Sequence, residues 1–243
     1  RILTQGGGRC CHCQINELSL PVACCYYQIK QFSLPYTNDA TFTLSNQPIL
    51  YYVIAHLTKY NIKKIHIASG YKSGMIDEYF SDNRYEADIC IYDSGDADII
   101  KRIQDILVSV QKDVLILYGD TISNVDINEL ILRHRKYSKE ITMTVWPLKV
   151  SYGIVEIGEN ETAGSFSEKP TLDKWINIGY FYINYSFRDM LFKHNSFESF
   201  LLESVNIMSI NAYKHSGLHI TVNTLSELEE AKRNINNILV DEM

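Results

Sequence analysis

The apolar run from Val114 to Leu117 most constrains how this chain can fold. It shows no alternation of polar and apolar residues, and it ends at Tyr118, Gly119 and Asp120. A short apolar run that stops at a glycine is typical of a strand buried on both faces of a parallel sheet. Ligands of open α/β sheets bind at the carboxyl ends of such strands. The sequence therefore predicts that Asp120 lies at a binding site.

Asp120 has a plainer alternative role, as a helix cap or a turn residue. An amphipathic segment begins at Ile127, and the residue directly before a helix is the one that caps it. Asp126 occupies that position. We therefore favour Asp126 as the cap and Asp120 as a residue that contacts a ligand.

Strand and helix patterns alternate along residues 1–136. Strands are predicted at 1–4, 64–68, 87–92 and 114–117, and helices at 49–60, 74–80, 99–110 and 127–136. This alternation predicts right-handed crossovers between parallel strands. After residue 136 the spacing of the predicted strands 141–147, 153–157 and 178–184 is hairpin-like, and a helix is predicted at 226–239. The predicted fold class is α/β, with a Rossmann-like, mixed but mainly parallel sheet flanked by helices.

Composition excludes two classes of partner. A net charge of -6 offers no basic face for the phosphates of a nucleic acid. The apolar stretches are shorter than the roughly 20 residues that a membrane span needs, and no charged-then-apolar leader opens the chain. We expect a cytoplasmic protein without nucleic-acid or membrane partners. Amphipathic strands in the second half of the chain could form an edge between copies, so a homo-oligomer is also compatible with the sequence.

Several motifs occur in the order typical of one enzyme family. They are a glycine loop at 6–9, NQPIL at 46–50, SGYKSGMIDEYF at 69–80, DSGDADIIKRI at 93–103, YGDTISNVDI at 118–127, YGIVEI at 152–157, SFSEKP at 165–170 and WINIGYFYIN at 175–184. The chain resembles the sugar-1-phosphate nucleotidyltransferases, particularly the short bacterial members related to glucose-1-phosphate cytidylyltransferase. The similarity is continuous from residue 46 onward.

The resemblance implies the fold of nucleotide-diphospho-sugar transferases and a single domain, 1–243, with a nucleotide-binding half (1–136) and a sugar-phosphate half (137–243). It implies that a sugar 1-phosphate and a nucleoside triphosphate form a nucleotide sugar and pyrophosphate, for polysaccharide biosynthesis. Such a reaction depends on positioning and on neutralising converging negative charges, with Mg²⁺ as cofactor. The alternative is a catalytically impaired relative that binds a sugar or nucleotide and acts as a regulator.

The resemblance also implies roles for particular residues. Asp120 and Asn223 match the metal ligands, with a neutral Asn where relatives commonly have Asp. Lys169 matches a lysine that contacts the sugar phosphate, and its compact charge suits that task. The further implied residues are Tyr152, Gly153, Glu168, Asn177 and Gly179 for the sugar phosphate, and Gly6, Gly7, Gly8, Ser94, Gly95, Asp96 and Gly119 for the nucleotide. Ser94 to Asp96 are expected at the start of a helix, and a plain helix cap there remains an alternative.

The first 45 residues depart from the family pattern. Gly6 to Arg9 provide the glycine loop and an arginine, but Cys10 to Gln14 replace the residues expected next. The matching catalytic lysine is Lys30, although its spacing to Pro48 is several residues too long and Asp39 falls where many relatives have lysine. Either an insertion separates Lys30 from its usual neighbours or the lysine is absent, in which case activity is severely reduced.

Five cysteines gather in the same segment. Cys10 and Cys13 have the spacing of a zinc knuckle, but no second knuckle follows, and the adjacent pairs fit one tetrahedral site poorly. We favour reduced thiols over a zinc site.

Overall fold

The computed structural model describes residues 22–26, 43–44, 47–70, 73–82, 85–222, 227–229 and 231–233. The strands are β1 (Val22–Tyr26), β2 (Thr43–Leu44), β3 (Gln47–Pro48), β4 (Lys64–Ser69), β5 (Asp88–Asp93), β6 (Val114–Tyr118), β7 (Thr121–Ser123), β8 (Ile141–Lys149), β9 (Ile154–Ile157), β10 (Ala163–Ser167), β11 (Thr171–Ile183), β12 (Ile210–Lys214) and β13 (His219–Thr221). The helices are α1 (Ile49–Lys59), α2 (Ser73–Asp82), α3 (Ile99–Leu107), α4 (Ile127–Tyr137), α5 (Arg188–Phe192) and α6 (Phe197–Asn206), with 3-10 turns η1 (Glu159–Glu161) and η2 (Tyr185–Phe187). None of the described helices is long and apolar enough to span a membrane.

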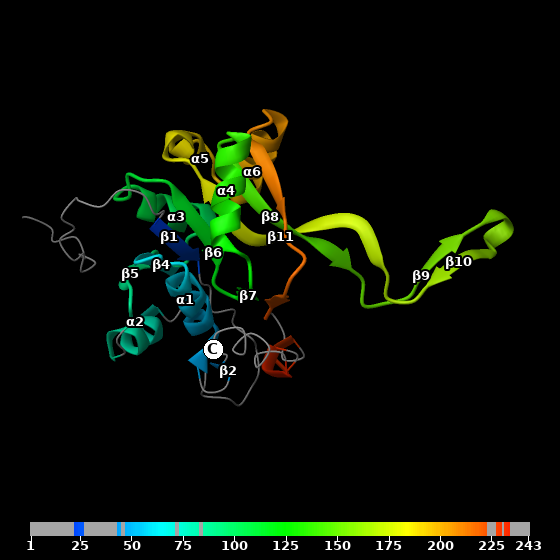
Figure 1. Cartoon of the computed structure of the whole chain (residues 1–243), viewed down its shortest axis with the longest axis horizontal. Coiled ribbons are helices and arrows are strands. Elements are labelled where there is room, and N and C mark those ends of the chain that lie inside the picture. The colour runs from blue at the N-terminus through cyan, green and yellow to red at the C-terminus, as the bar shows by residue number, and fades with distance from the viewer. Residues whose placement is uncertain are drawn as a thin grey trace, which may run out of the picture.

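A seven-stranded sheet forms the centre of the molecule, in the order β12-β8-β11-β6-β1-β4-β5 (Figure 1). β1, β4, β5 and β6 pair in parallel, and β12 pairs in parallel with β8. Within this sheet, β11 runs antiparallel to both of its neighbours, β6 and β8. This sheet confirms the predicted mixed, mainly parallel α/β class. Strands from both expected halves of the chain belong to it.

Helices cover both faces of the sheet. α1, α2 and α4 pack on the face that carries Leu115 and Leu117, whereas α3, α5 and α6 pack on the face that carries Val114 and Ile116. Successive side chains of a strand point to opposite faces, so β6 needs apolar residues at every position. The lack of alternation in its sequence reflects this double burial.

The predicted helices and strands after residue 46 agree with the structure, apart from their ends. Asp126 caps α4, since its Oδ1 accepts a hydrogen bond of 2.9 Å from the Glu129 amide. The expectation that Ser94 to Asp96 begin a helix is wrong, because α3 begins at Ile99 after Asp98. In the predicted C-terminal helix, the described residues 227–229 and 231–233 are helical.

The sequence patterns missed two strands of the seven-stranded sheet, the edge strand β12 and the central strand β1. β1 contains Cys24 and Cys25, and it lies between β4 and β6 at the centre of the sheet. The predicted first strand, 1–4, lies outside the described residues, as do the glycine loop, Lys30 and Cys10 to Cys13.

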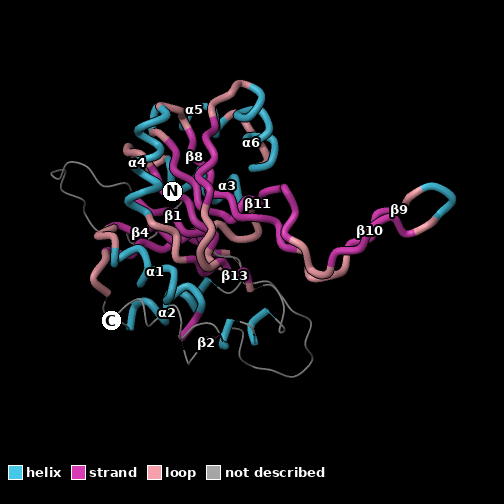
Figure 2. The backbone as a smooth tube through the Cα atoms, turned by 45° about the vertical axis from the view of Figure 1, so that its right-hand side comes forward, coloured by secondary structure: helices cyan, strands magenta, loops and turns pink. Residues whose placement is uncertain are grey.

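A second feature, also missed, is an arm formed by residues 150–170. β9 and β10 pair as an antiparallel hairpin that projects away from the rest of the molecule, as both Figure 1 and Figure 2 show. The arm continues outward from the ends of β8 and β11, where Thr171 pairs with Lys149.

Candidate functional site

The carboxyl ends of β4, β5 and β6 meet at one edge of the sheet. Ala68, Tyr26 and Tyr118 are neighbours in register across β4, β1 and β6, and Leu117 is opposite Tyr180 of β11. Neighbouring strands lie about 4.8 Å apart, so the ends of β5 and β6 are roughly 15 Å from each other. An extended nucleotide spans a comparable length. This edge is where ligands of open α/β sheets bind.

Asp120 lies at this edge, two residues after the end of β6. Its backbone carbonyl accepts a hydrogen bond of 3.0 Å from the Val222 amide, and its Oδ1 lies 3.3 Å from the Thr121 hydroxyl, which donates to it. The short β7–β13 pair holds this segment, with Thr121 opposite Thr221. The structure therefore brings the end of β13 to Asp120. Asn223 itself lies outside the described residues.

The side-chain oxygen atoms at Asp120 are of the type that can hold a magnesium ion. Asp120 has a carboxylate, the Thr121 hydroxyl lies 3.3 Å from its Oδ1, and the Thr221 hydroxyl lies 3.4 Å from that of Thr121. In the described part of the chain, no three His, Cys, Asp or Glu side chains gather around one point. Mg²⁺ is typically held by one or two protein carboxylates together with substrate phosphates and water. A single carboxylate is thus compatible with Mg²⁺ that arrives with a nucleotide.

Gly179 lies beside the same strand end and must be a glycine there. Its φ is +78°, and a Cβ atom at this position would be 2.4 Å from Cγ of the Tyr118 ring. The Gly179 amide donates a hydrogen bond of 2.9 Å to Oδ1 of Asn177. The structure thereby places Asn177 and Gly179 next to Tyr118, and so close to Gly119 and Asp120.

The loop after β5 contains Ser94, Gly95 and Asp96. Gly95 has a φ of +56° and donates its amide to Asp93 Oδ1 at 2.9 Å. A hydrogen bond of 2.6 Å from the Ser73 hydroxyl lowers the pKa of Asp93, and the Gly95 amide and the nearby Arg102 charge act in the same direction. Asp93 therefore remains a carboxylate that orders this loop.

Arg102 is a positioning residue that the sequence analysis missed. Its side chain is 2% exposed, and it donates Nε to the Ala97 carbonyl (2.7 Å) and Nη2 to the Gly95 carbonyl (2.9 Å). A Cβ atom on Gly70 would be 2.3 Å from its Nη1. One sequence feature could have identified Arg102. It lies three positions after Ile99 and four before Ile106, so it is a charged residue on the apolar face of the predicted helix.

The remaining predicted residues lie at the base of the arm. A Cβ atom on Gly153 would be 2.6 Å from the Phe166 ring and 3.1 Å from Glu168 Oε2, and the Lys169 backbone has a φ of +45°. Tyr152, Gly153, Glu168 and Lys169 are therefore gathered at one place, where all are exposed. The structure does not bring this cluster to Asp120.

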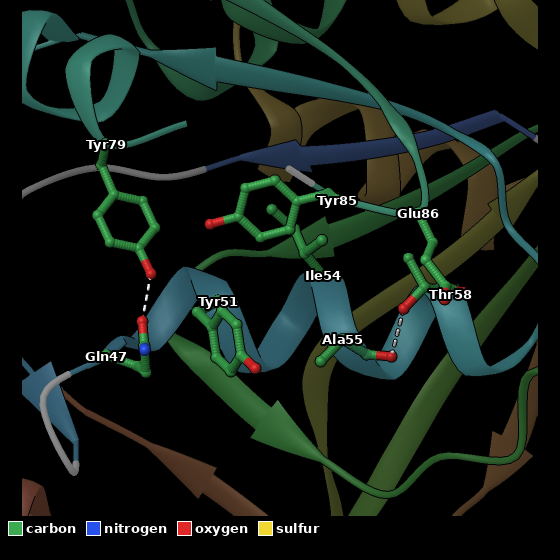
Figure 3. Close-up of a pocket in the computed structure, with 8 residues that line it drawn as sticks. All are labelled: Gln47, Tyr51, Ile54, Ala55, Thr58, Tyr79, Tyr85 and Glu86. Carbon is green, nitrogen blue, oxygen red and sulfur yellow. Dashed lines mark hydrogen bonds between the residues drawn. The ribbon is translucent and has the colours of Figure 1, made fainter. Parts of the chain in front are cut away.

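A cavity of about 240 Å³ lies elsewhere, between α1, α2 and the start of β5 (Figure 3). Figure 3 shows the rings of Tyr51, Tyr79 and Tyr85 around it, with the Tyr79 hydroxyl bonded to Gln47. Burial raises the pKa of Tyr85 above its ordinary value. The residues that line this cavity include none of the predicted site residues.

The fold of this chain is shared with a solved structure. The crystal structure of HddC from Yersinia pseudotuberculosis superposes on this chain with a TM-score of 0.66 and 16% identity, covering 87% of this chain and 99% of HddC. This similarity shows the fold.

The sequence comparisons then identify the family. The family model described as "Nucleotidyl transferase" matches residues 37–227. The chain is 30% identical over 133 residues to D-glycero-alpha-D-manno-heptose 1-phosphate guanylyltransferase of Aneurinibacillus thermoaerophilus, covering 52% of this chain and 56% of that protein. It is 27% identical over 175 residues to glucose-1-phosphate cytidylyltransferase of Salmonella typhimurium, covering 61% of this chain and 67% of that protein. The chain belongs to the nucleotidyl transferase family, which confirms the resemblance to the sugar-1-phosphate nucleotidyltransferases.

Proposed function

We propose that this protein is a Mg²⁺-dependent sugar-1-phosphate nucleotidyltransferase. It joins a nucleoside triphosphate to a sugar 1-phosphate, with attack of the sugar-phosphate oxygen on the α-phosphorus and release of pyrophosphate. The observation that carries the proposal is Asp120 at the carboxyl end of β6, within the family match of residues 37–227. The non-catalytic alternative is not favoured, because this carboxylate and its glycine neighbours are retained in the family order.

Each candidate residue has a task in this proposal. Asp120, with Asn223, holds Mg²⁺, which neutralises the charge of the phosphates when it is bound. The 93–96 loop, ordered by Arg102, receives the nucleoside. Asn177 and Gly179 present backbone and amide groups to the sugar, and Lys169 contacts the sugar phosphate. The glycine loop at 6–9, with Arg9 and Lys30, binds the triphosphate.

The two named relatives are a guanylyltransferase and a cytidylyltransferase, so GTP and CTP are the first triphosphates to test. Nucleotide sugars are donors for glycan assembly. We propose that the product is made in the cytoplasm as a precursor for polysaccharide biosynthesis.

Pyrophosphate release from the four triphosphates, combined with a panel of sugar 1-phosphates, tests the proposal. We expect turnover with one pair, its loss on chelation of Mg²⁺ by EDTA, and a decrease of at least roughly a hundredfold in Asp120→Asn. Asp126→Asn is the matched control, because Asp126 caps α4 and asparagine caps a helix about as well. The absence of both turnover and triphosphate binding, the latter measured by calorimetry with Mg²⁺, would refute the proposal.

A further inference from the structure

A line of hydrogen-bonding side chains leads from Asp120 to His219, a residue that the sequence patterns did not single out. The Thr121 hydroxyl donates to Asp120 Oδ1 at 3.3 Å, and it lies 3.4 Å from the Thr221 hydroxyl. The Thr221 hydroxyl in turn lies 3.4 Å from Nε2 of His219. The pairing of β7 with β13 explains this line, because Thr121 is opposite Thr221, and His219 lies two positions from Thr221 on the same face of β13.

The number of available protons fixes the direction of each hydrogen bond in this line. A hydroxyl has one proton to donate, and a carboxylate only accepts. Since Thr121 gives its proton to Asp120, the Thr221 hydroxyl must donate to Thr121. The proton of Thr221 is then used, so Nε2 of His219 must donate to Thr221. The geometry therefore requires His219 with its proton on Nε2.

The surroundings of the His219 ring agree with this tautomer. Burial lowers the pKa of His219 from 6.5 to about 4, so the ring is neutral at pH 7 and carries one proton. Its Nδ1 atom is buried and has no hydrogen-bond partner among the described residues, so none of them holds a proton there. The Trp146 ring of β8 lies 5.3 Å from the His219 ring, between centroids, and Trp146 Nε1 donates to the Gly217 carbonyl at 2.9 Å. These contacts hold the imidazole in place.

We propose that His219 is a positioning residue, which orients the Asp120 carboxylate for a divalent cation through the hydroxyls of Thr221 and Thr121. This inference rests on the proposed function, because it takes Asp120 as the Mg²⁺ ligand. Every bond of the relay points its proton toward the carboxylate, which favours the ionised form. Thr121 occupies one of the about four lone-pair directions of the carboxylate and leaves the others for the cation. Outer partners of this kind typically change metal affinity by about 10–100-fold.

Paired substitutions test the relay through metal binding. Thr221→Val removes the hydroxyl with little change of shape, whereas Thr221→Ser keeps it. His219→Leu removes the donor, whereas His219→Gln keeps an N–H group that can donate to Thr221. The probe is Mn²⁺ with GTP or CTP, and its binding is measured by the enhancement of water proton relaxation.

We expect the Mn²⁺ dissociation constant to increase about tenfold in Thr221→Val and His219→Leu, at the lower end of the range because the relay acts through Thr121. It should stay within about threefold of the wild-type value in the two conservative variants. In turnover, KM for Mg²⁺ should increase by more than kcat falls in the same two disruptive variants. Urea denaturation checks that all four variants are folded.

The tautomer of His219 is a second readout, which needs neither turnover nor metal. Long-range ¹H–¹⁵N spectra of the ¹⁵N-labelled full chain at pH 7 report whether each ring nitrogen carries a proton. The signal that is missing from His219→Gln assigns His219. We expect a protonated Nε2 and a bare Nδ1. A proton on Nδ1, alone or together with one on Nε2, would overturn the relay.

The outcomes distinguish this proposal from the proposed function. Equal Mn²⁺ binding by the wild type and all four variants would refute the relay and leave the proposed function intact. An equal loss of affinity in the conservative and the disruptive variants would also overturn the relay, because the retained hydroxyl or N–H group would then have no effect. A wild type that binds no Mn²⁺ with either nucleotide would refute the proposed function, and the tautomer would then decide whether the relay exists.

Discussion

Replacing Gly179 by alanine tests the tightest contact at the site edge. Alanine at a φ of +78° is strained, which costs about 1–2 kcal/mol. Its Cβ would also be 2.4 Å from Cγ and Cδ2 of Tyr118, and such overpacking costs about 1–3 kcal/mol. The free energy of unfolding should therefore decrease by roughly 2–5 kcal/mol. For a domain of this size, the corresponding fall in Tm is on the order of 5–15 °C.

Urea denaturation followed by circular dichroism measures this change. Gly74→Ala is the matched control, because nothing lies within 4 Å of its would-be Cβ, and we expect it to be neutral or to stabilise by up to about 1 kcal/mol. The double variant Gly179→Ala with Tyr118→Ala separates the two causes. Removing the ring relieves the contacts with Cγ and Cδ2, but the 2.8 Å approach to the Tyr118 Cβ and the backbone strain remain, so the double variant should be less destabilised than the sum of the single variants by about 1–2 kcal/mol. A Gly179→Ala protein as stable as the wild type would refute this reasoning.

Two further predictions concern buried polar groups. Arg102→Met should remove the donors to Gly95 and Ala97 and lower stability by about 2–4 kcal/mol. It should raise KM for the triphosphate more than it lowers kcat, and an unchanged KM in steady-state assays would contradict the role of Arg102 in ordering the loop. Burial lowers the pKa of His66 from 6.5 to about 4, so the unfolded chain binds a proton more readily than the folded protein between these values. Stability from this residue is present above pH 6.5 and is lost as pH falls to about 4, by roughly 2–3 kcal/mol. His66→Gln should show a correspondingly smaller loss of unfolding free energy between pH 7 and pH 4.5, and an unchanged loss in denaturation curves would count against this account.

The sequence by itself determined most strands of the sheet, but not β1 or β12, and one end of the site. The uniform apolar run of β6 predicted a doubly covered parallel strand, because both faces of that strand must be buried. Its abrupt end predicted the position of Asp120, and the position directly before Ile127 predicted the cap at Asp126. These features depend on local chain periodicity and capping, which a single sequence displays.

Only the tertiary structure decided which residues meet. Gly70 and Arg102 are 32 positions apart in the sequence, yet the guanidinium fills the space where a side chain on Gly70 would lie. β1 lies at the centre of the sheet although its sequence shows no recognisable strand pattern. Its pairing with β4 and β6, and not its own periodicity, determines that position. The motif order likewise suggested one sugar-phosphate site, but the length of β8 and β11 separates Lys169 from Gly179. Contacts of this kind depend on the register and length of paired strands, which the order of motifs along the chain does not specify.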